Sequence, residues 1–543
     1  MFNSYFSSVF TDEDTTNAPD IETQTDGTSI ETIEITQEIV KKHLDKLNIS
    51  KAGGPDGIHA RILQECSEYL SVALEIIYNK SLESGNLPKQ WKEANVKPLY
   101  KKGKKQLTQN YRPVSLTSVC CKVLEKIIRN NIVKHLESLG VITNDQHGFR
   151  EGRSCNTQLL EIMEIWTSLI DKGIPWDCAY LDFAKAFDSV PHQRLIKKIE
   201  SYGIKGQLLK WVTSFLTNRQ QRVIVGNKHS NWANVKSGIP QGSVLGPILF
   251  IIYINDLPNE IKSYSKMFAD DTKIFKALYS IQDSTTLQDD LIKLAEWSNI
   301  WQLPFNESKC KIIHYGKKNP NQSYQMNGHL LETVHEEKDL GVTFDSELKF
   351  STHIRNIVSK ANSRVGIIKR TFDTLDTENF KLLYKSLVRP ILEYCSNIWH
   401  PILIRDMSEI EKVQKRATKL VTGLEDLPYE NRLKTLNITT LEYRRNRNDM
   451  LQVYRLINGL DNTDLNLFFQ LDTSRRTRGH SYKLTKPRAN TTIRANVFSH
   501  RAINPWNALN DNVVCANTIN SFKDRLEAAW NDKPVKFSPS FWH

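Results

Sequence analysis

The spacing of apolar and polar positions changes character near residue 345. Short apolar runs predict strands at 96–100, 179–183, 222–225 and 266–268. Helical spacing predicts helices at about 60–84 and 118–139 and, in the later part, at 351–372, 377–396 and 407–422. Strands and helices that alternate first, followed by helices alone, predict an α+β fold with a mainly helical C-terminal extension.

The charge distribution divides the chain in a different way. Residues 1–50 hold ten acids and three lysines, a balance of −7, so the net charge of +12 leaves +19 on the remainder. Residues 11–34 also have few large apolar groups, which predicts a flexible acidic connector over residues 1–35. Residues 401–543 hold 23 Lys or Arg against 15 acids. A basic body fits a nucleic-acid partner and, equally well, a solvated surface without one.

Composition excludes several classes of protein. With 39% hydrophobic and 25% charged residues, the chain has an ordinary globular balance. The longest apolar stretch, 244–254, is too short to span a bilayer, and no secretory signal is visible at the N-terminus. We therefore expect an intracellular protein that is neither membrane-bound nor secreted. The eight scattered cysteines, including the adjacent and presumed buried Cys120 and Cys121, predict reduced thiols and no zinc site.

One acid follows a short apolar strand in the stretch YLDFAKAFDSVPH, residues 180–192. Asp182 is expected at the open edge of a core strand, where a metal ion could bind. Asp188 or Ser189 is expected to cap the next helix, with Pro191 in its first turn. Considered alone, Asp182 is more simply explained as a solvated strand-end acid.

A second pair of acids lies in MFADDTK, residues 267–273. The pattern predicts a hairpin with Asp270 and Asp271 at its turn, where acids are also common for structural reasons. Adjacent carboxylates repel each other, and a divalent cation such as Mg²⁺ removes that penalty. Together with Asp182, the pair could hold two metal ions, as phosphoryl or nucleotidyl transfer requires.

A third stretch, SGIPQGSVLGPILF at 237–250, places a Gly- and Pro-rich loop before an apolar helix. Gly238 and Gly242 permit close backbone approach, and Gln241 can hydrogen-bond a base or a sugar. Such loops also have purely structural uses, so this stretch is a weak signal by itself.

Six stretches in order resemble the reverse transcriptase of non-LTR (LINE-type) retrotransposons, in particular the jockey-like branch. They are KPLYKKG at 97–103, NYRPVSL at 110–116, QHGFR at 146–150, LDFAKAFD at 181–188, GIPQGS at 238–243 and FADD at 268–271. The resemblance covers about residues 40–345. It implies a right-hand polymerase with fingers and palm in residues 36–345, a helical thumb in 346–400 and a basic region of unknown role in 401–543.

The resemblance also implies a metal site and a nucleotide site. Two Mg²⁺ ions, or Mn²⁺ in their place, would be bound by Asp182, Asp270, Asp271 and the backbone carbonyl of Phe183. Lys101 and Arg112 match residues that hold the triphosphate, which suits a point charge and a forked guanidinium. Phe187 would exclude a ribose 2′-OH, or would simply pack at a strand–helix junction. Gln241 and Gly242 would lie beneath the templating pair. Lys309 would lie near the pyrophosphate as a general acid.

The implied nucleic-acid contacts are shorter and weaker matches. Arg150 and Arg153 resemble template contacts, although ordinary surface arginines look the same. Leu340 and Gly341 lie in KDLGVTF, residues 338–344, which resembles the hairpin that grips the primer end. The implied partners are an RNA template, a DNA primer or target and dNTPs, in a ribonucleoprotein of the nucleus or cytoplasm. The sequence predicts no oligomeric state.

Relatives usually carry an endonuclease domain before the polymerase, and residues 1–10 resemble the connector that follows that domain. We therefore expect a truncated copy or a fragment of a longer reading frame that does not nick DNA itself. Two alternatives remain open: an active RNA-directed DNA polymerase, favoured by its complete set of site residues, or an inactive remnant that only binds nucleic acid. An intron maturase or telomerase-type polymerase is a weaker alternative.

Overall fold

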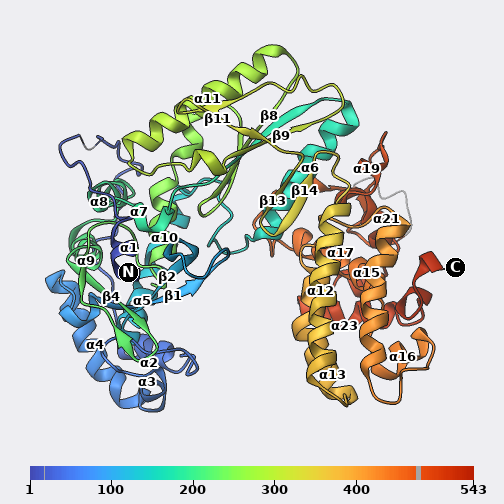
Figure 1. The fold of residues 1–543 in the computed structure, drawn as a ribbon, viewed down its shortest axis with the longest axis horizontal. Coiled ribbons are helices and arrows are strands. Elements are labelled where there is room, and N and C mark those ends of the chain that lie inside the picture. The colour runs from blue at the N-terminus through green and yellow to red at the C-terminus, as the bar shows by residue number, and fades with distance from the viewer. Residues whose placement is uncertain (18, 473–478, 543) are drawn as a thin grey trace.

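The computed structural model describes residues 1–17, 19–472 and 479–542. Figure 1 shows two lobes on either side of a sheet that lies at the top of the view. The N-terminal lobe (blue and green) mixes helices with a second sheet, and the C-terminal lobe (yellow to red) is built mainly of helices. This arrangement confirms the predicted α+β fold with its mainly helical C-terminal extension.

The central sheet has the strand order β12-β9-β3-β8-β7. Its strands are β3 (Trp176–Leu181), β7 (Tyr264–Phe268), β8 (Asp271–Ala277), β9 (Lys311–Tyr315) and β12 (Glu332–Thr333). Alternate residues of β3 enter different cores: Ala179 lies with α10 (Gly246–Ile254) and α11 (Ile281–Ile300), and Cys178 lies with α6 (Cys155–Lys172). Because both faces are covered, the strand is apolar at every position except the buried Asp177.

The second sheet belongs to the N-terminal lobe. It contains β1 (Glu93–Tyr100), β2 (Tyr111–Leu116), β4 (Arg219–Val225), β5 (Lys228–His229) and β6 (Ala233–Val235). Around it lie α2 (Gln37–Leu44), α3 (Ala60–Glu65), α4 (Ser67–Ser84), α5 (Val119–Leu139), α8 (His192–Ser201) and α9 (Gly206–Leu216). The helix expected at 60–84 is broken at Cys66, which lies between α3 and α4.

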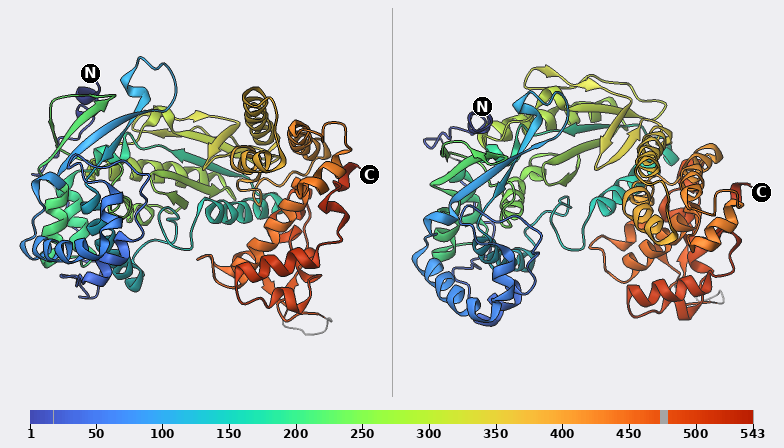
Figure 2. Two further views of the ribbon diagram at one scale, coloured as in Figure 1. Left: turned by 90° about the horizontal axis from the view of Figure 1, so that it is seen from below. Right: turned by 60° about the horizontal axis from the view of Figure 1, so that its bottom comes forward.

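The C-terminal lobe starts after the hairpin of β13 (Glu336–Asp339) and β14 (Val342–Asp345). Its main helices are α12 (Ser351–Thr371), α13 (Thr377–Leu383), α14 (Arg389–Glu393), α15 (Ile404–Ala417), α16 (Tyr429–Leu436), α17 (Leu441–Ile457) and α23 (Ile519–Ala529). The single helix expected at 377–396 is interrupted by a π-helical turn at Tyr384–Val388. This wider turn precedes Pro390, which has no N–H to continue an α-helical ladder. Figure 2 shows this lobe standing apart from the N-terminal lobe in two further views.

The acidic lead-in is held against the N-terminal lobe, contrary to the expected flexible connector. It begins with α1 (Phe2–Ser7), whose Phe6 is buried against Val96 and Val223. The Glu13 carboxylate accepts hydrogen bonds from Arg194 and from the first backbone N–H groups of α8. Composition missed this because a few well-placed side chains make these contacts while the rest of the segment stays polar.

The adjacent pair of cysteines is buried, as the sequence predicts. All eight cysteines are free, and Cys120 and Cys121 are buried in α5. Only Cys66 in the N-terminal lobe and Cys515 in the C-terminal lobe are exposed. Within the described ranges, no helix has the length and apolarity needed to cross a bilayer.

Candidate active site

Three carboxylates meet at one edge of the central sheet. In the antiparallel pairing of β3 and β8, Leu181 lies opposite Thr272, so the next positions, Asp182 and Asp271, are cross-strand neighbours. Asp270 lies in the two-residue turn between β7 and β8, whose ends pair at Phe268 and Asp271. Two strand ends and one turn thus bring together acids that are almost 90 residues apart in sequence.

Burial and mutual repulsion perturb these acids. Burial, followed by the neighbouring Asp182 carboxylate, raises the pKa of Asp270. Burial and the Asp270 carboxylate raise the pKa of Asp271 to about 6. Asp182 instead forms an ion pair with Lys309, at 2.7 Å between Nζ and Oδ2. Among the described residues, no group of three or more acids, histidines or cysteines is already arranged around a metal position.

The chemistry of the donors nevertheless fits a divalent cation. Oxygen ligands on carboxylates are those that Mg²⁺ and Mn²⁺ prefer. A cation beside Asp270 and Asp271 would relieve the repulsion that raises both pKa values. For Asp182 to join them, its ion pair with Lys309 must open. The backbone carbonyl of Asp182 accepts from Asn306 N–H at 2.7 Å, and the next ring, Phe183, stacks on Phe305.

A cluster of cations faces the acids from the second sheet. Lys101 directly follows β1, and Arg112 lies on β2, paired with Leu99 of β1. Burial lowers the pKa of Lys101, the nearby Arg112 and Lys309 lower it further, and Asp182 opposes them. An anion bound among these side chains would therefore be stabilised by all three cations at once. Acids and bases from both sheets thus form one electrostatic site.

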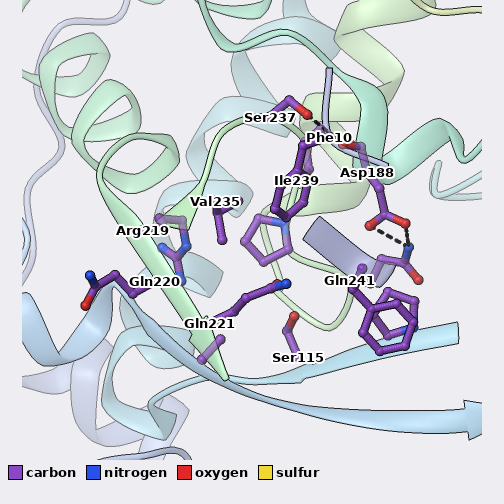
Figure 3. A pocket seen from close by; sticks show the side chains of 15 residues that line it. Phe10, Ser115, Asp188, Arg219, Gln220, Gln221, Val235, Ser237, Ile239 and Gln241 are labelled. Atoms are coloured by element: carbon purple, nitrogen blue, oxygen red, sulfur yellow. Dashed lines mark hydrogen bonds between the residues drawn. The ribbon is translucent and has the colours of Figure 1, made fainter. Parts of the chain in front are cut away.

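The Gly-rich loop lies between Ser115 of the second sheet and Asp188, as Figure 3 shows. The Ile239 N–H donates to the Phe187 carbonyl and the Ser115 N–H donates to the Gln241 carbonyl, each at 2.7 Å. The Gln241 side chain donates from Nε2 to both carboxylate oxygens of Asp188 at 2.9 Å. At Gly242, with φ +119°, a Cβ would lie 2.6 Å from the Ser115 carbonyl, so no larger residue fits.

Two predictions concern the segment after Asp182: the helix cap at Asp188 or Ser189, and the role of Phe187. Asp188 and Ser189 do not cap the following helix; they lie inside the short helix α7 (Ala186–Ser189), and Pro191 precedes α8. Local sequence could not show this because the carboxylate of Asp188 is used by Gln241, 53 residues later. Phe187 stacks on Phe250 at 4.6 Å between ring centroids. The ring therefore packs against a neighbour, as one of the two predicted roles requires, and the role in sugar selection stays a prediction.

The hairpin β13–β14 completes one wall of the site. An open pocket is lined by Asp182, Asp271 and Lys309 on one side and by Lys338 and Leu340 of the hairpin on the other. At the hairpin tip, Leu340 and Gly341 both have positive φ, and the Leu340 carbonyl accepts from the Tyr394 hydroxyl at 2.8 Å. The hairpin tip is therefore tied to the C-terminal lobe.

Sequence reasoning missed the buried ion pair that joins this hairpin to the sheet. Lys273 of β8 and Asp339 of β13 form it, and both side chains are almost completely covered. Lys273 lies two residues after Asp271, in a stretch that the sequence analysis quotes, but its partner is 66 residues away. No local pattern marks that partner.

The two arginines expected to contact the template are engaged inside the protein. Arg150 donates to the backbone carbonyl of Thr143 at 2.7 Å. Arg153 donates to the backbone carbonyl and the side chain of Asn144 and contacts His147. Both guanidiniums therefore shape the loop before α6. A template contact at either position stays a prediction.

Comparison with known proteins identifies relatives of this chain. Residues 100–344 match the family described as "Reverse transcriptase (RNA-dependent DNA polymerase)". The chain is 28% identical over 403 residues to "RNA-directed DNA polymerase from mobile element jockey" of Drosophila melanogaster, covering 72% of this chain and 44% of that protein. From the same organism, the probable RNA-directed DNA polymerases of transposon BS and transposon X-element are each 28% identical, over 437 and 415 residues. These two alignments cover 76% and 73% of this chain and 47% and 44% of the relatives. The chain spans less than half the length of these relatives.

Proposed function

We propose that the chain is an RNA-directed DNA polymerase, because residues 100–344 match the reverse transcriptase family and the chain is similar to the polymerase of mobile element jockey. It would extend a DNA primer on an RNA template from dNTPs. One observation carries the proposal: strand register sets Asp182 against Asp271, with Asp270 in the adjoining turn, opposite the cations Lys101 and Arg112. Opposed acids and bases of this kind suit the transfer of a charged phosphoryl group.

The acids are the proposed metal ligands. Asp182, Asp270 and Asp271, with the Phe183 carbonyl, would hold two Mg²⁺ or Mn²⁺ ions. When bound, such ions activate the attacking hydroxyl and neutralise the charge that develops on the leaving oxygen. Lys309 forms an ion pair with Asp182 and would be released when the carboxylate turns to a cation. It would then lie beside the pyrophosphate, where its ammonium can donate a proton.

The other site residues would bind and select the nucleotide. Lys101 and Arg112 would hold the triphosphate, and Gln241 and Gly242 would lie beneath the templating pair. Asp188 keeps the Gln241 amide in place, so its oxygen can accept from a base or sugar. Phe187, backed by Phe250, would form the floor that leaves no room for a 2′-OH.

We propose that the chain is divided into the subdomains that the resemblance implies. Residues 36–345 would form fingers and palm, and residues 346–400 the thumb. Arg150, Arg153, Leu340 and Gly341 would line the path of the template and primer. Helix α12 supports a nucleic-acid role for the thumb because it contains five Lys or Arg and no acid. Residues 401–543 would support this thumb, in a ribonucleoprotein with the template RNA.

The test is incorporation of dNTPs on a primed RNA in Mg²⁺, with the Asp270→Asn protein beside the wild type. Incorporation by the wild type alone would support the polymerase and its acids together. Absence of incorporation by both proteins, with primed RNA still bound, would contradict the proposal and favour an inactive nucleic-acid-binding protein.

A further inference from the structure

The QHGFR stretch forms an extra rung on the edge of the central sheet, beside the proposed metal ligands. The Met267 N–H of β7 donates to the Asp145 carbonyl at 2.9 Å. The His147 N–H donates back to the Met267 carbonyl at 2.8 Å, in a parallel bridge between Gln146 and Met267. This rung brings Gln146 and Gly148 to the turn that carries Asp270.

The Gln146 side chain is placed to hold the backbone of that turn. Its Oε1 accepts from the Ala269 N–H at 2.9 Å and from the Gly148 N–H at 2.8 Å. Gln146 is 1% exposed, and within the described part of the chain its Nε2 has no hydrogen-bond partner. Only the acceptor half of the amide is used, and it is used on the residue directly before Asp270.

The turn needs such support because Ala269 is strained. Its φ is +55°, a left-handed conformation that is unfavourable for any residue with a Cβ. Such strain persists only where the surroundings impose it, and it gathers at functional sites. Relaxing Ala269 would rotate the peptide that follows, and with it the Asp270 carboxylate.

Gly148 provides the space for this contact. A Cβ at Gly148 would lie 2.5 Å from the Ala269 nitrogen and 3.0 Å from the Phe268 carbonyl carbon. Both neighbours are backbone atoms of the turn, so a side chain could be accepted only if the turn moved. The loop is anchored from behind, where the fully buried His147 bonds Thr157 and contacts Glu161 of α6.

We propose that Gln146 and Gly148 are positioning residues of the active site, which hold Ala269 in its left-handed turn and so set the Asp270 and Asp271 carboxylates. The proposal rests on the proposed polymerase function for its effect on the reaction. The hydrogen bond and the glycine contact are features of the chain itself.

The first test replaces the acceptor. Gln146→Met keeps the length and burial of the side chain but removes Oε1. We expect kcat for dNTP addition to fall about 100-fold, since a misplacement of about 1 Å can cost that much. The Kd for primed RNA and the KM for dNTP should stay within about twofold because neither contact involves Gln146. Gly148→Ala should show the same split between kcat and KM.

Two further variants separate positioning from general damage. Ala269→Gly removes the strain, so adding it to Gln146→Met should restore at least about tenfold of the lost kcat. The matched control is Gln158→Met in α6, a buried glutamine whose Oε1 and Nε2 have no hydrogen-bond partner among the described residues. This control should leave kcat unchanged.

The last measurement does not depend on activity. Amide hydrogen exchange at Ala269 should become faster in Gln146→Met and stay as in the wild type in Gln158→Met. Unchanged exchange together with a kcat within about twofold of wild type would overturn the positioning role. A wild-type protein that incorporates no dNTP would contradict the proposed function, and exchange at Ala269 would still decide whether Gln146 holds the turn.

Discussion

Two acids at the sheet edge and two ion pairs of the C-terminal lobe differ in how their charges are partnered. At the edge, Asp270 and Asp271 lie beside each other with raised pKa values, although Arg112 and Lys101 act against the rise at Asp270 and Lys273 acts against it at Asp271. In the C-terminal lobe, Arg501 forms a two-point ion pair with Asp449, and Arg444 pairs with Glu393 in the same way. Within the described part of the chain, Asp270 and Asp271 form no ion pair, whereas Arg501 and Arg444 each hold a carboxylate at two points.

The difference separates charges that stabilise the fold as ion pairs from charges that are available to bind a ligand. A buried acid whose partner is missing is costly, and removing one member of a buried pair costs about 3–5 kcal/mol. Unpaired acids at an open edge are therefore functional candidates. Paired charges such as Arg501 and Asp449 join helices and need no ligand to explain them.

The largest expected effect is on the sheet edge. Asp270→Asn should lower dNTP incorporation at least about 1,000-fold, since it removes a proposed metal ligand. It should leave stability unchanged or slightly higher because it also removes a buried repulsion. Incorporation and thermal unfolding, measured on the same preparations, check both. The exposed Asp289 of α11 provides the control Asp289→Asn. Equal activity of both variants would remove Asp270 from the site.

The matching change in the C-terminal lobe should have the reverse signature. Arg501→Ala leaves the Asp449 carboxylate buried without its two-point partner and should cost about 3–5 kcal/mol of unfolding free energy. Incorporation per folded molecule should be unchanged. Urea unfolding followed by activity at low temperature measures the two quantities. A loss of kcat at full stability would assign this lobe a part in the reaction.

A pair of stacked phenylalanines sharpens the comparison. Phe187→Ala should lower discrimination against rNTPs about 10- to 100-fold, because the proposed floor beneath the sugar is removed. Phe522 of α23 stacks on Tyr454 at 4.4 Å and is fully buried. Phe522→Ala should cost about 3–5 kcal/mol of stability and leave sugar selection unchanged. Competition between dNTP and rNTP in single-nucleotide addition distinguishes them. If Phe187→Ala discriminates between dNTP and rNTP as well as the wild type does, Phe187 has only a packing role.

The smallest effect is on the pH dependence of stability in metal-free buffer. The folded chain holds the Asp271 proton more tightly than the unfolded chain does, since its pKa is raised from 3.8 to about 6. Asp271 therefore lowers stability progressively as pH rises from about 4 to 6. The gain in melting temperature from Asp271→Asn should grow over that range.

The paired Glu161 should show the opposite trend. Burial raises its pKa, but His147 and Lys266 outweigh burial and lower it to about 2. Its stabilising contribution is present above about 4.5 and is lost as pH falls toward 2. Glu161→Gln should therefore cost most at neutral pH. Melting curves of both variants from pH 3 to 7 would test the contrast, and parallel curves would refute it.

The sequence predicts the acids of the candidate site better than the residues that hold those acids in place. Asp182 at a strand end and Asp270 and Asp271 at a hairpin turn follow from local pattern, and the structure has both features. The bonds from Gln146 to Ala269 and from Lys273 to Asp339 cross 123 and 66 residues. Periodicity and turn chemistry act over a few residues and carry no information about such partners. The contacts of the acidic lead-in could not be predicted for the same reason, because Glu13 meets Arg194 only in the folded chain.

The placement of the two exposed thiols has a practical consequence for the study of motion. Cys66 and Cys515 lie in different lobes, and the other six cysteines are less accessible. A donor and an acceptor dye could therefore be attached to the natural chain without engineered sites. Energy transfer between them would report whether the lobes approach each other when primed RNA and a nucleotide bind.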